Sequence, residues 1–213
     1  MKYKGIIFDL DGVICSTDEY HYQAWKTLAD RLQIPFDRER NNLLRGVSRM
    51  ESLEIILEQS DRRFSEEEKI KLATEKNDLY RKLLGGMTPA DLPDGVKSTL
   101  DKLRSMGLKL AIGSSSKNTP FILDRIGLGS FFDAVADGNC ITHSKPDPEV
   151  FLKAAEMIEL RPDECVVVED AHAGVEAANA GGFDCAAVGD ARDDDRAKWH
   201  LAAVPELPEC IVQ

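Results

Sequence analysis

Short apolar runs recur along the chain, and a polar or glycine-rich turn follows each of them. The runs lie at residues 5–8, 108–112, 134–136, 165–168 and 185–188. Near-continuous apolar runs of this length are typical of strands that are buried on both faces of a parallel sheet. We therefore predict five strands, one at each run.

The segments between these runs carry apolar residues at helical spacing. They include Val96, Leu100 and Leu103, with Gly107 as a helix stop, and the stretches 148–160 and 173–180, the latter closed by Gly181 and Gly182. Because strands and helices alternate, the pattern predicts an α/β fold with a doubly wound, Rossmann-like parallel-sheet core.

Residues 16–84 break this alternation, because they show helical periodicity and no convincing strand. Ser16, Thr17, Asp18 and Glu19 fit a capping box. The apolar positions of three helices follow: Ala24, Trp25, Leu28 and Leu32; Leu53, Ile56 and Leu57; and those of the stretch 65–84. We predict a small helical cap domain over residues 16–87, inserted after the first strand of a core formed by residues 1–15 and 88–213.

Composition and charge narrow the class of protein. Of the 213 residues, 43% are hydrophobic, which is ample for a globular core. The chain has 27 Lys and Arg residues against 38 Asp and Glu residues, and its net charge is -11. Such an acidic chain is a poor candidate for binding nucleic acid or an anionic membrane surface. Binding to a phosphate group would require local cations or a metal ion.

The five cysteines are scattered and have no CxxC spacing, so neither a disulfide framework nor a zinc site is predicted. Cys165 and Cys185 lie in apolar runs, and we expect them in the core. The apolar runs are far shorter than the ~20 residues of a membrane span. The chain opens on a strand-like segment without a signal peptide. We expect a cytoplasmic protein that works as a monomer.

Two carboxylates follow the first predicted strand at once, in the motif DLDG at residues 9–12. Open α/β sheets place active sites at this end of a strand, and alternation sends Asp9 and Asp11 roughly the same way. Neighbouring carboxylates repel unless a cation joins them, so the pair indicates a hard metal such as Mg²⁺. A calcium loop is excluded, because its sixth and twelfth positions would be Ile14 and Tyr20. A surface turn with two acids is the alternative.

Three other strand ends carry side chains of related chemistry. Glu169 and Asp170 close the fourth strand and offer further oxygen ligands. Ser114 follows the second strand, where a hydroxyl and backbone N–H groups can hold a phosphoryl oxygen. Lys145 supplies one cation in a loop whose prolines fix the backbone. Each signal is weak alone, since acid pairs, serine turns and surface lysines are common, but together they predict a metal- and phosphate-binding site.

The order of these motifs resembles the haloacid dehalogenase superfamily of phosphotransferases. The motifs are FDLDG, IGSSS, Lys145 in KPDP, and VVVEDAHAG. A helical insert directly after the first motif is similar to members of that superfamily with a small α-helical cap. Within the cap, the segments 18–21, 45–49 and 76–77 resemble sugar phosphomutases of the superfamily in particular.

The resemblance implies a role for each residue of the core motifs. Asp9 would be the nucleophile that forms an aspartyl-phosphate. Asp11 would be the general acid and base for the sugar oxygens. Ser114 and Lys145 would bind the transferring phosphoryl group. The side chain of Asp9, the backbone carbonyl of Asp11, and Glu169 and Asp170 would hold Mg²⁺.

For the substrate, the resemblance implies a sugar phosphate whose phosphate moves between C1 and C6 of glucose. Turnover would pass through β-D-glucose 1,6-bisphosphate, which also primes the enzyme, and this requires a second phosphate pocket. Suitable donors for that pocket are Arg49 in the cap and Ser116, Lys117 and Asn118 in the core. The other residues expected to bind substrate or to support cap closure are His21, Gly46, Val47, Ser52 and Lys76. Two alternatives remain: a sugar-phosphate phosphatase on the same scaffold, and a phosphate-binding module without turnover.

Overall fold

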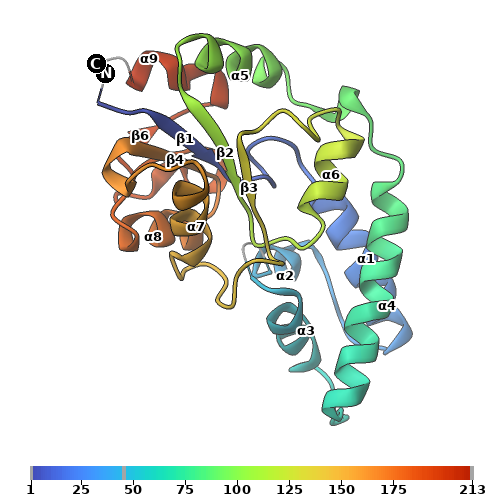
Figure 1. The fold of residues 1–213 in the computed structure, drawn as a ribbon. Helices are drawn as coiled ribbons and strands as arrows, with labels where there is room; N and C mark the ends of the chain where they lie inside the picture. Colours follow the sequence, from blue (N-terminus) through green and yellow to red (C-terminus); the bar gives the residue numbers. More distant parts are fainter. Residues whose placement is uncertain (1, 45–46, 212–213) are drawn as a thin grey trace. The chain divides into compact units, whose positions relative to one another are not determined.

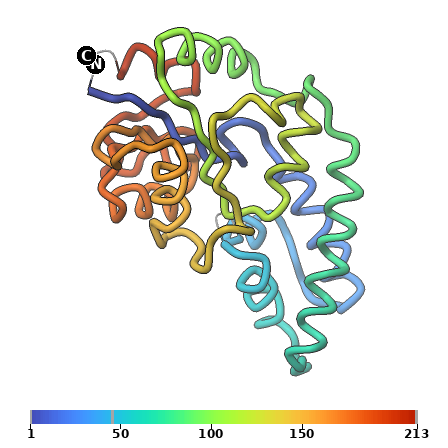
Figure 2. Tube along the Cα trace, viewed as in Figure 1, coloured from blue at the N-terminus to red at the C-terminus, as the bar shows by residue number. Residues whose placement is uncertain are grey.

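A computed structural model describes residues 2–44 and 47–211 of the chain. The chain divides into two compact units. The core unit contains the beginning of the chain through Ser16 and everything from Thr88 onward, and the cap unit runs from Thr17 to Met87. Figure 2 traces the path from the first strand into the helices of the cap unit and back. Among the described helices, none combines the length and the apolar character that crossing a membrane requires.

The described part of the core unit contains one six-stranded sheet in which neighbouring strands are parallel (Figure 1). Its strands are β1 (Gly5–Phe8), β2 (Lys109–Gly113), β3 (Ala134–Ala136), β4 (Cys165–Glu169), β5 (Asp184–Ala187) and β6 (Trp199–His200). The spatial order is β3-β2-β1-β4-β5-β6, so β1 lies between β2 and β4. This arrangement confirms the predicted doubly wound α/β fold.

Helices cover both faces of the sheet (Figure 1). The described helices of the core are α5 (Val96–Ser105), α6 (Thr119–Arg125), α7 (Glu149–Met157), α8 (His172–Ala180) and α9 (Leu207–Ile211), with short 3₁₀ turns at 89–91, 162–164, 189–193 and 204–206. Helices α7 and α8 pack on the face that carries Ile7 and Val167, together with Phe151 and Val175. Cys165 and Cys185 are buried in this same cluster, as predicted.

The strand register brings three strand ends to one edge of the sheet. Phe8 pairs with Ile112 of β2 and with Val168 of β4. The next residue, Asp9, continues this pairing through its N–H, which donates to the carbonyl of Val168 at 2.9 Å. The polar residues that follow β1, β2 and β4 therefore begin at the same level, and they share one edge of the core unit.

The described residues of the cap unit form helices joined by loops and contain no strand. Its helices are α1 (Asp18–Arg31), α2 (Arg38–Asn42), α3 (Arg49–Leu57) and α4 (Glu66–Leu84). Helices α1 and α4 pack side by side, and α3 packs on α4. Trp25, Leu53, Ile56 and Leu72 lie in the shared apolar core of these helices. The spacing of apolar residues therefore marked three of the four described helices.

The predicted capping box at residues 16–19 is wrong. Thr17, not Ser16, is the N-cap of α1, and its side chain makes no capping hydrogen bond. The Thr17 hydroxyl instead accepts a hydrogen bond from the hydroxyl of Tyr80 at 3.0 Å. Capping boxes form at Ser48 with Glu51 and at Ser65 with Glu68. The N-cap thus lies one residue later than predicted, and its hydroxyl makes a tertiary contact instead of capping the helix.

Candidate active site

Asp9 and Asp11 lie where β1 ends. Asp9 is 7% exposed, Leu10 between them is fully buried, and Asp11 is half-buried. The chain then turns sharply, and the Gly12 N–H donates to the carbonyl of Cys15 at 2.7 Å. The turn keeps Asp9 and Asp11 at the edge of the sheet, where β1 ends.

Lys145 joins the carboxylates that follow β1 and β4. Its ammonium group lies 2.5 Å from Asp9 Oδ1 and 2.5 Å from Glu169 Oε1, and all three side chains are buried. The ammonium group also lies over the ring of Phe151, 4.6 Å from the ring centre. Burial opposes the charge of Lys145, but the two carboxylates hold its pKa above the ordinary value. Lys145 is therefore a fixed cation at the centre of the site.

The single positive charge of Lys145 does not balance the negative charge of the carboxylates around it. Burial raises the pKa of Asp9 to about 7, although Lys145 opposes the shift, and the charge of Glu169 adds to it. Burial and the neighbouring charges of Glu169, Asp9 and Asp11 raise the pKa of Asp170 to about 9. These shifts show that the site favours additional positive charge or protons. A cation bound here would lower both pKa values.

The surroundings of Asp170 and Glu169 fit a divalent cation. Gly12 has a positive φ of 83°, and a Cβ there would lie 2.0 Å from Asp170 Oδ2, so a side chain would displace this carboxylate. Glu169 Oε2 accepts the Ala171 N–H at 2.9 Å, and the same carboxylate lies against Gly174. The available ligands are all oxygen atoms, which hard ions such as Mg²⁺ prefer.

The loop after β2 carries the predicted phosphate-binding residues. Ser114 is 3% exposed, and its hydroxyl accepts the N–H of Ser116 at 3.2 Å. The hydroxyl of Ser116 accepts the N–H of Asn118 at 3.2 Å. Asn118 is buried, whereas Lys117 is exposed. The loop is compact, and it begins at the same edge of the sheet as Asp9.

The loop after β3 packs against the loop of residues 114–118. Asn139 Nδ2 donates to the carbonyl of Lys117 at 3.1 Å, and the Gly138 N–H donates to that of Ser116 at 3.3 Å. A Cβ at Gly138 would lie 2.3 Å from the carbonyl oxygen of Ser115. Glycine is therefore required for the two loops to approach this closely.

In the cap unit, a group of polar and aromatic side chains gathers between α1 and α4. We call His21, Trp25, Lys76 and Tyr80 the cap cluster. Lys76, which is only 3% exposed, donates to His21 Nδ1 at 2.9 Å and lies over the rings of Trp25 and Tyr80 at 4.5 and 4.6 Å. The rings of His21 and Tyr80 are 4.0 Å apart. The cap cluster thus brings the buried Lys76 ammonium group into contact with an imidazole and two aromatic rings.

Lys76 fixes the protonation state of His21. An ammonium group has no acceptor, so Nδ1 must accept this hydrogen bond and Nε2 must carry the proton of a neutral ring. Burial holds the pKa of His21 well below 6.5, and the charges of Lys76 and Arg49 lower it further. Arg49 is the first residue of α3 and is half-buried, which lowers its own pKa from the usual value. Two cations thus act on one imidazole of the cap unit.

The remaining predicted cap residues are less informative. Ser52 is 3% exposed within α3, and Val47 is half-buried just before that helix. Gly46 lies outside the described residues.

The sequence prediction gave no role in the site to several residues that shape the core site and the cap cluster. Tyr80 and Phe151 were not singled out, Gly12 and Gly174 appeared only within the quoted motifs, and Trp25 was placed in the cap core. The helical spacing offered one signal, because Tyr80 follows Lys76 by four residues, as Trp25 follows His21. Nothing local marked Phe151, and the motif that contains Gly174 did not show that this glycine lies against Glu169.

Comparison with known proteins agrees with this geometry. A family model described as haloacid dehalogenase-like hydrolase matches residues 3–182. The chain belongs to this family. A β-phosphoglucomutase from Bacillus subtilis is 42% identical over 188 residues, covering 87% of this chain and 83% of the relative. A crystal structure of β-phosphoglucomutase from Clostridium difficile is 37% identical, with a TM-score of 0.91 over 99% of this chain and all of that one.

The family also contains phosphatases of similar size. A fructose-1-phosphate phosphatase from Escherichia coli is 34% identical over 184 residues, covering 86% of this chain and 95% of the relative. Membership of the family therefore indicates phosphoryl chemistry, and the acceptor of the phosphoryl group has to be argued separately.

Proposed function

We propose that this chain is a magnesium-dependent β-phosphoglucomutase, an isomerase that interconverts β-D-glucose 1-phosphate and glucose 6-phosphate. The similarity to β-phosphoglucomutases in both sequence and structure supports this proposal. The observation that carries it is the buried contact of Lys145 with Asp9 and Glu169 at the edge of the sheet. It pairs a candidate nucleophile with the cation needed to neutralise a phosphoryl group.

In the proposed reaction, Asp9 attacks phosphorus, the bond from phosphorus to the sugar oxygen breaks, and an aspartyl-phosphate forms. Asp11 protonates the departing sugar oxygen, and it takes the proton from the incoming hydroxyl in the reverse step. Lys145 and the hydroxyl of Ser114 bind the transferring group. Transfer from Asp9 to the C6 hydroxyl of glucose 1-phosphate gives β-D-glucose 1,6-bisphosphate. Return of the C1 phosphate to Asp9 then releases glucose 6-phosphate.

A magnesium ion would be held by the Asp9 carboxylate, the Asp11 carbonyl and the two acids after β4, Glu169 and Asp170. When bound, Mg²⁺ would neutralise charge on the phosphoryl oxygens and orient that group. The raised pKa values of Asp9 and Asp170 support this assignment, because both carboxyls favour a nearby cation. Glu169 already accepts Lys145 and the Ala171 N–H, so part of its role is to orient the site.

A bisphosphate intermediate needs donors for the phosphate that is not being transferred. We assign Ser116, Lys117 and Asn118 of the core unit and Arg49 of the cap unit to this task. His21, Lys76 and the neighbouring residues Gly46, Val47 and Ser52 would recognise the sugar phosphate. A cationic cap cluster favours an anionic sugar as acceptor over water, which distinguishes the mutase from a phosphatase.

The test supplies β-D-glucose 1-phosphate, Mg²⁺ and a trace of the bisphosphate and follows glucose 6-phosphate and free phosphate together. The proposal predicts glucose 6-phosphate with little free phosphate, and no turnover with EDTA. Omitting the bisphosphate is the matched control, and it should produce a lag. Stoichiometric release of phosphate would contradict the mutase.

A sugar-phosphate phosphatase is the second candidate, and the likeness to the fructose-1-phosphate phosphatase of Escherichia coli supports it. The same Asp9, Lys145 and Mg²⁺ ligands would serve, with water as the second acceptor. Hydrolysis of fructose 1-phosphate faster than isomerisation of β-D-glucose 1-phosphate would favour this reading.

We further propose that the enzyme works as a monomer in the cytoplasm. The five cysteines are all free, and a reducing compartment would keep them so. Sedimentation at micromolar concentration tests the monomer, for which a mass of 23.6 kDa is expected.

A further inference from the structure

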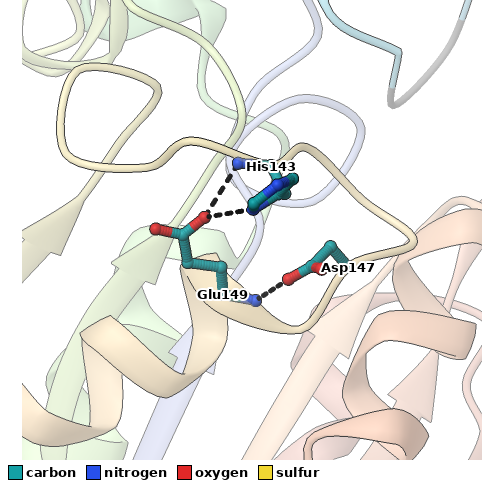
Figure 3. A group of neighbouring side chains, drawn as sticks. All are labelled: His143, Asp147 and Glu149. Carbon is teal, nitrogen blue, oxygen red and sulfur yellow. Dashed lines mark hydrogen bonds and ion pairs between the residues drawn. The ribbon is translucent and has the colours of Figure 1, made fainter.

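Three potential ligand groups lie together in the loop that carries Lys145 (Figure 3). They are the side chains of His143, Asp147 and Glu149, and Glu149 is the first residue of α7. This loop runs from the end of β3 to the start of α7, and Lys145 lies in its middle. Nothing in the proposed chemistry uses these three residues.

One oxygen of Glu149 closes the loop. Glu149 Oε2 accepts the Thr142 N–H at 2.9 Å, the Thr142 hydroxyl at 2.9 Å and the His143 N–H at 2.8 Å. The hydrogen bond from His143 and those from Thr142 outweigh partial burial and lower the pKa of Glu149 to about 2. The carboxylate therefore stays ionised across the whole physiological pH range. It binds the backbone N–H groups of Thr142 and His143, which precede Lys145 in the chain.

A second contact fixes the other half of the loop. Asp147 Oδ1 accepts the Glu149 N–H at 2.9 Å, and the Asp147 N–H donates to the carbonyl of Ser144 at 3.1 Å. Lys145 is thus held between Thr142 and Glu149 by hydrogen bonds on both sides. Its long side chain must reach two carboxylates on other strands, so a shift of this backbone would move the ammonium group.

A metal ion is a poorer explanation of this cluster. The Glu149 oxygen nearest to His143 Nδ1, at 3.4 Å, is the same atom that already accepts three hydrogen bonds. A cation on that oxygen would compete with all three donors. His143 contributes its backbone N–H to the loop closure, and its ring is exposed.

We infer that Glu149 is a positioning residue for phosphoryl transfer, which acts by closing the 142–149 loop and holding Lys145 against Asp9 and Glu169. This inference rests on the proposed function only for the role of Lys145 in binding the phosphoryl group. Glu149 itself touches neither the reacting group nor the carboxylates of the site.

The test measures formation of the aspartyl-phosphate from acetyl phosphate in a single turnover, alongside the KM for β-D-glucose 1-phosphate. Glu149→Ala should slow phosphorylation by about 10- to 100-fold and leave the KM for the sugar nearly unchanged. Glu149→Gln keeps one oxygen acceptor and should recover most of the rate. Thr142→Val removes a single donor and should slow the step by about 3-fold.

Two control variants separate positioning from stability and from metal binding. Glu164 makes a similar clamp at the opposite end of β4, where its carboxylate accepts the Arg161 N–H at 3.1 Å and Lys4 at 2.6 Å. Glu164→Ala should lower the unfolding midpoint without slowing phosphorylation. His143→Ala should behave like the wild type, because the backbone N–H remains.

Equal rates in Glu149→Ala and the wild type would overturn the inference. An equal loss in Glu164→Ala or His143→Ala would overturn it as well, in favour of general stability or a metal. If Glu149→Ala does not fold, the graded losses in Glu149→Gln and Thr142→Val decide the question. Because acetyl phosphate needs no sugar, a wild type that is phosphorylated but forms no glucose 6-phosphate would refute the mutase and leave this inference testable.

Discussion

The two candidate sites each contain a buried lysine, but the side chains in contact with the two lysines differ in chemistry. In the core unit, Lys145 is buried among Asp9, Glu169 and further carboxylates, and negative charge is in excess. In the cap unit, Lys76 is buried against an imidazole and two aromatic rings.

This difference separates two tasks that a phosphomutase must perform. An acid-rich site binds a divalent cation and presents a carboxylate nucleophile, so the core unit is suited to phosphoryl transfer. In the cap unit, the buried Lys76 ammonium group lies over two aromatic faces, and we propose that this unit selects the anionic acceptor. Each prediction below tests one side of this division.

The largest effect is expected at the nucleophile. Asp9→Asn should lower mutase turnover by at least about 10³-fold and abolish the phosphoenzyme, because an amide cannot form the acyl-phosphate. Intact-mass measurement after exposure to acetyl phosphate provides the readout. Asp94→Asn makes the same chemical change at an exposed position and should be silent. Detection of phosphorylated protein in the Asp9→Asn variant would contradict the proposal that Asp9 is the nucleophile.

Next in size is the loss of the central cation. Lys145→Met should lower kcat by about 10²- to 10³-fold and destabilise the metal-free protein by about 3 kcal/mol, because it leaves buried carboxylates without a partner. Without Lys145 the pKa of Asp9 rises further, so the folded state prefers the protonated acid. Asp9 of the wild type ionises near pH 7, so the destabilisation should grow as the pH rises above about 7.

Urea unfolding at several pH values measures this effect. The half-exposed Lys198, which bonds Asp184 at 2.9 Å, provides the matched control. Lys198→Met should lower the free energy of unfolding by less than about 1 kcal/mol. A destabilisation by Lys145→Met that is the same at pH 5 and pH 8 would contradict the charge argument.

A smaller and more selective effect is expected in the cap cluster. Lys76→Met should lower kcat/KM for β-D-glucose 1-phosphate by about 10- to 100-fold, because the acceptor loses a cation. Phosphorylation by acetyl phosphate should stay close to the wild-type rate. Lys82→Met, on an exposed position of the same helix, is the control. Equal losses of rate in sugar turnover and in phosphorylation by acetyl phosphate would contradict the proposed division of tasks between the units.

The smallest expected effect is a pH dependence of the stability of the cap unit. The pKa of His21 is lower in the folded protein than the ordinary 6.5. Its neutral ring therefore stabilises the fold fully above pH 6.5, and this contribution is lost as the pH falls toward the folded pKa. Unfolding followed by Trp25 fluorescence in a Trp199→Phe background measures it. His21→Gln should lose less stability on acidification, and parallel curves for the two proteins would refute the assignment.

Most of the core could be predicted because its signals are local. The strands β1, β2 and β4 are apolar runs, and each ends in the polar residues that the register brings to one edge. The strand β6 escaped prediction because it has two residues, of which Trp199 is half-buried and His200 exposed. The short helices α2, α6 and α9 have at most seven residues and show too few apolar repeats.

The site was predictable in its residue types but not in its contacts. The acids, the serine and the lysine follow strands and could be read from the sequence. The placement of Lys145 between Asp9 and Glu169 depends on pairings over 136 and 24 residues. The start of α1 was placed one residue early, at Ser16, and the actual N-cap residue Thr17 bonds Tyr80, which is 63 residues away. Spacing along the chain does not encode such distant partners.

The most direct test of this division of tasks is the fate of the phosphoryl group on Asp9. The enzyme is phosphorylated with acetyl phosphate, freed of the donor, and mixed with β-D-glucose 1-phosphate and Mg²⁺. The account predicts that most of the phosphoryl group appears in the bisphosphate and then in glucose 6-phosphate, and that Lys76→Met shifts it toward free phosphate. Transfer to water at the same rate with and without the sugar would contradict the account.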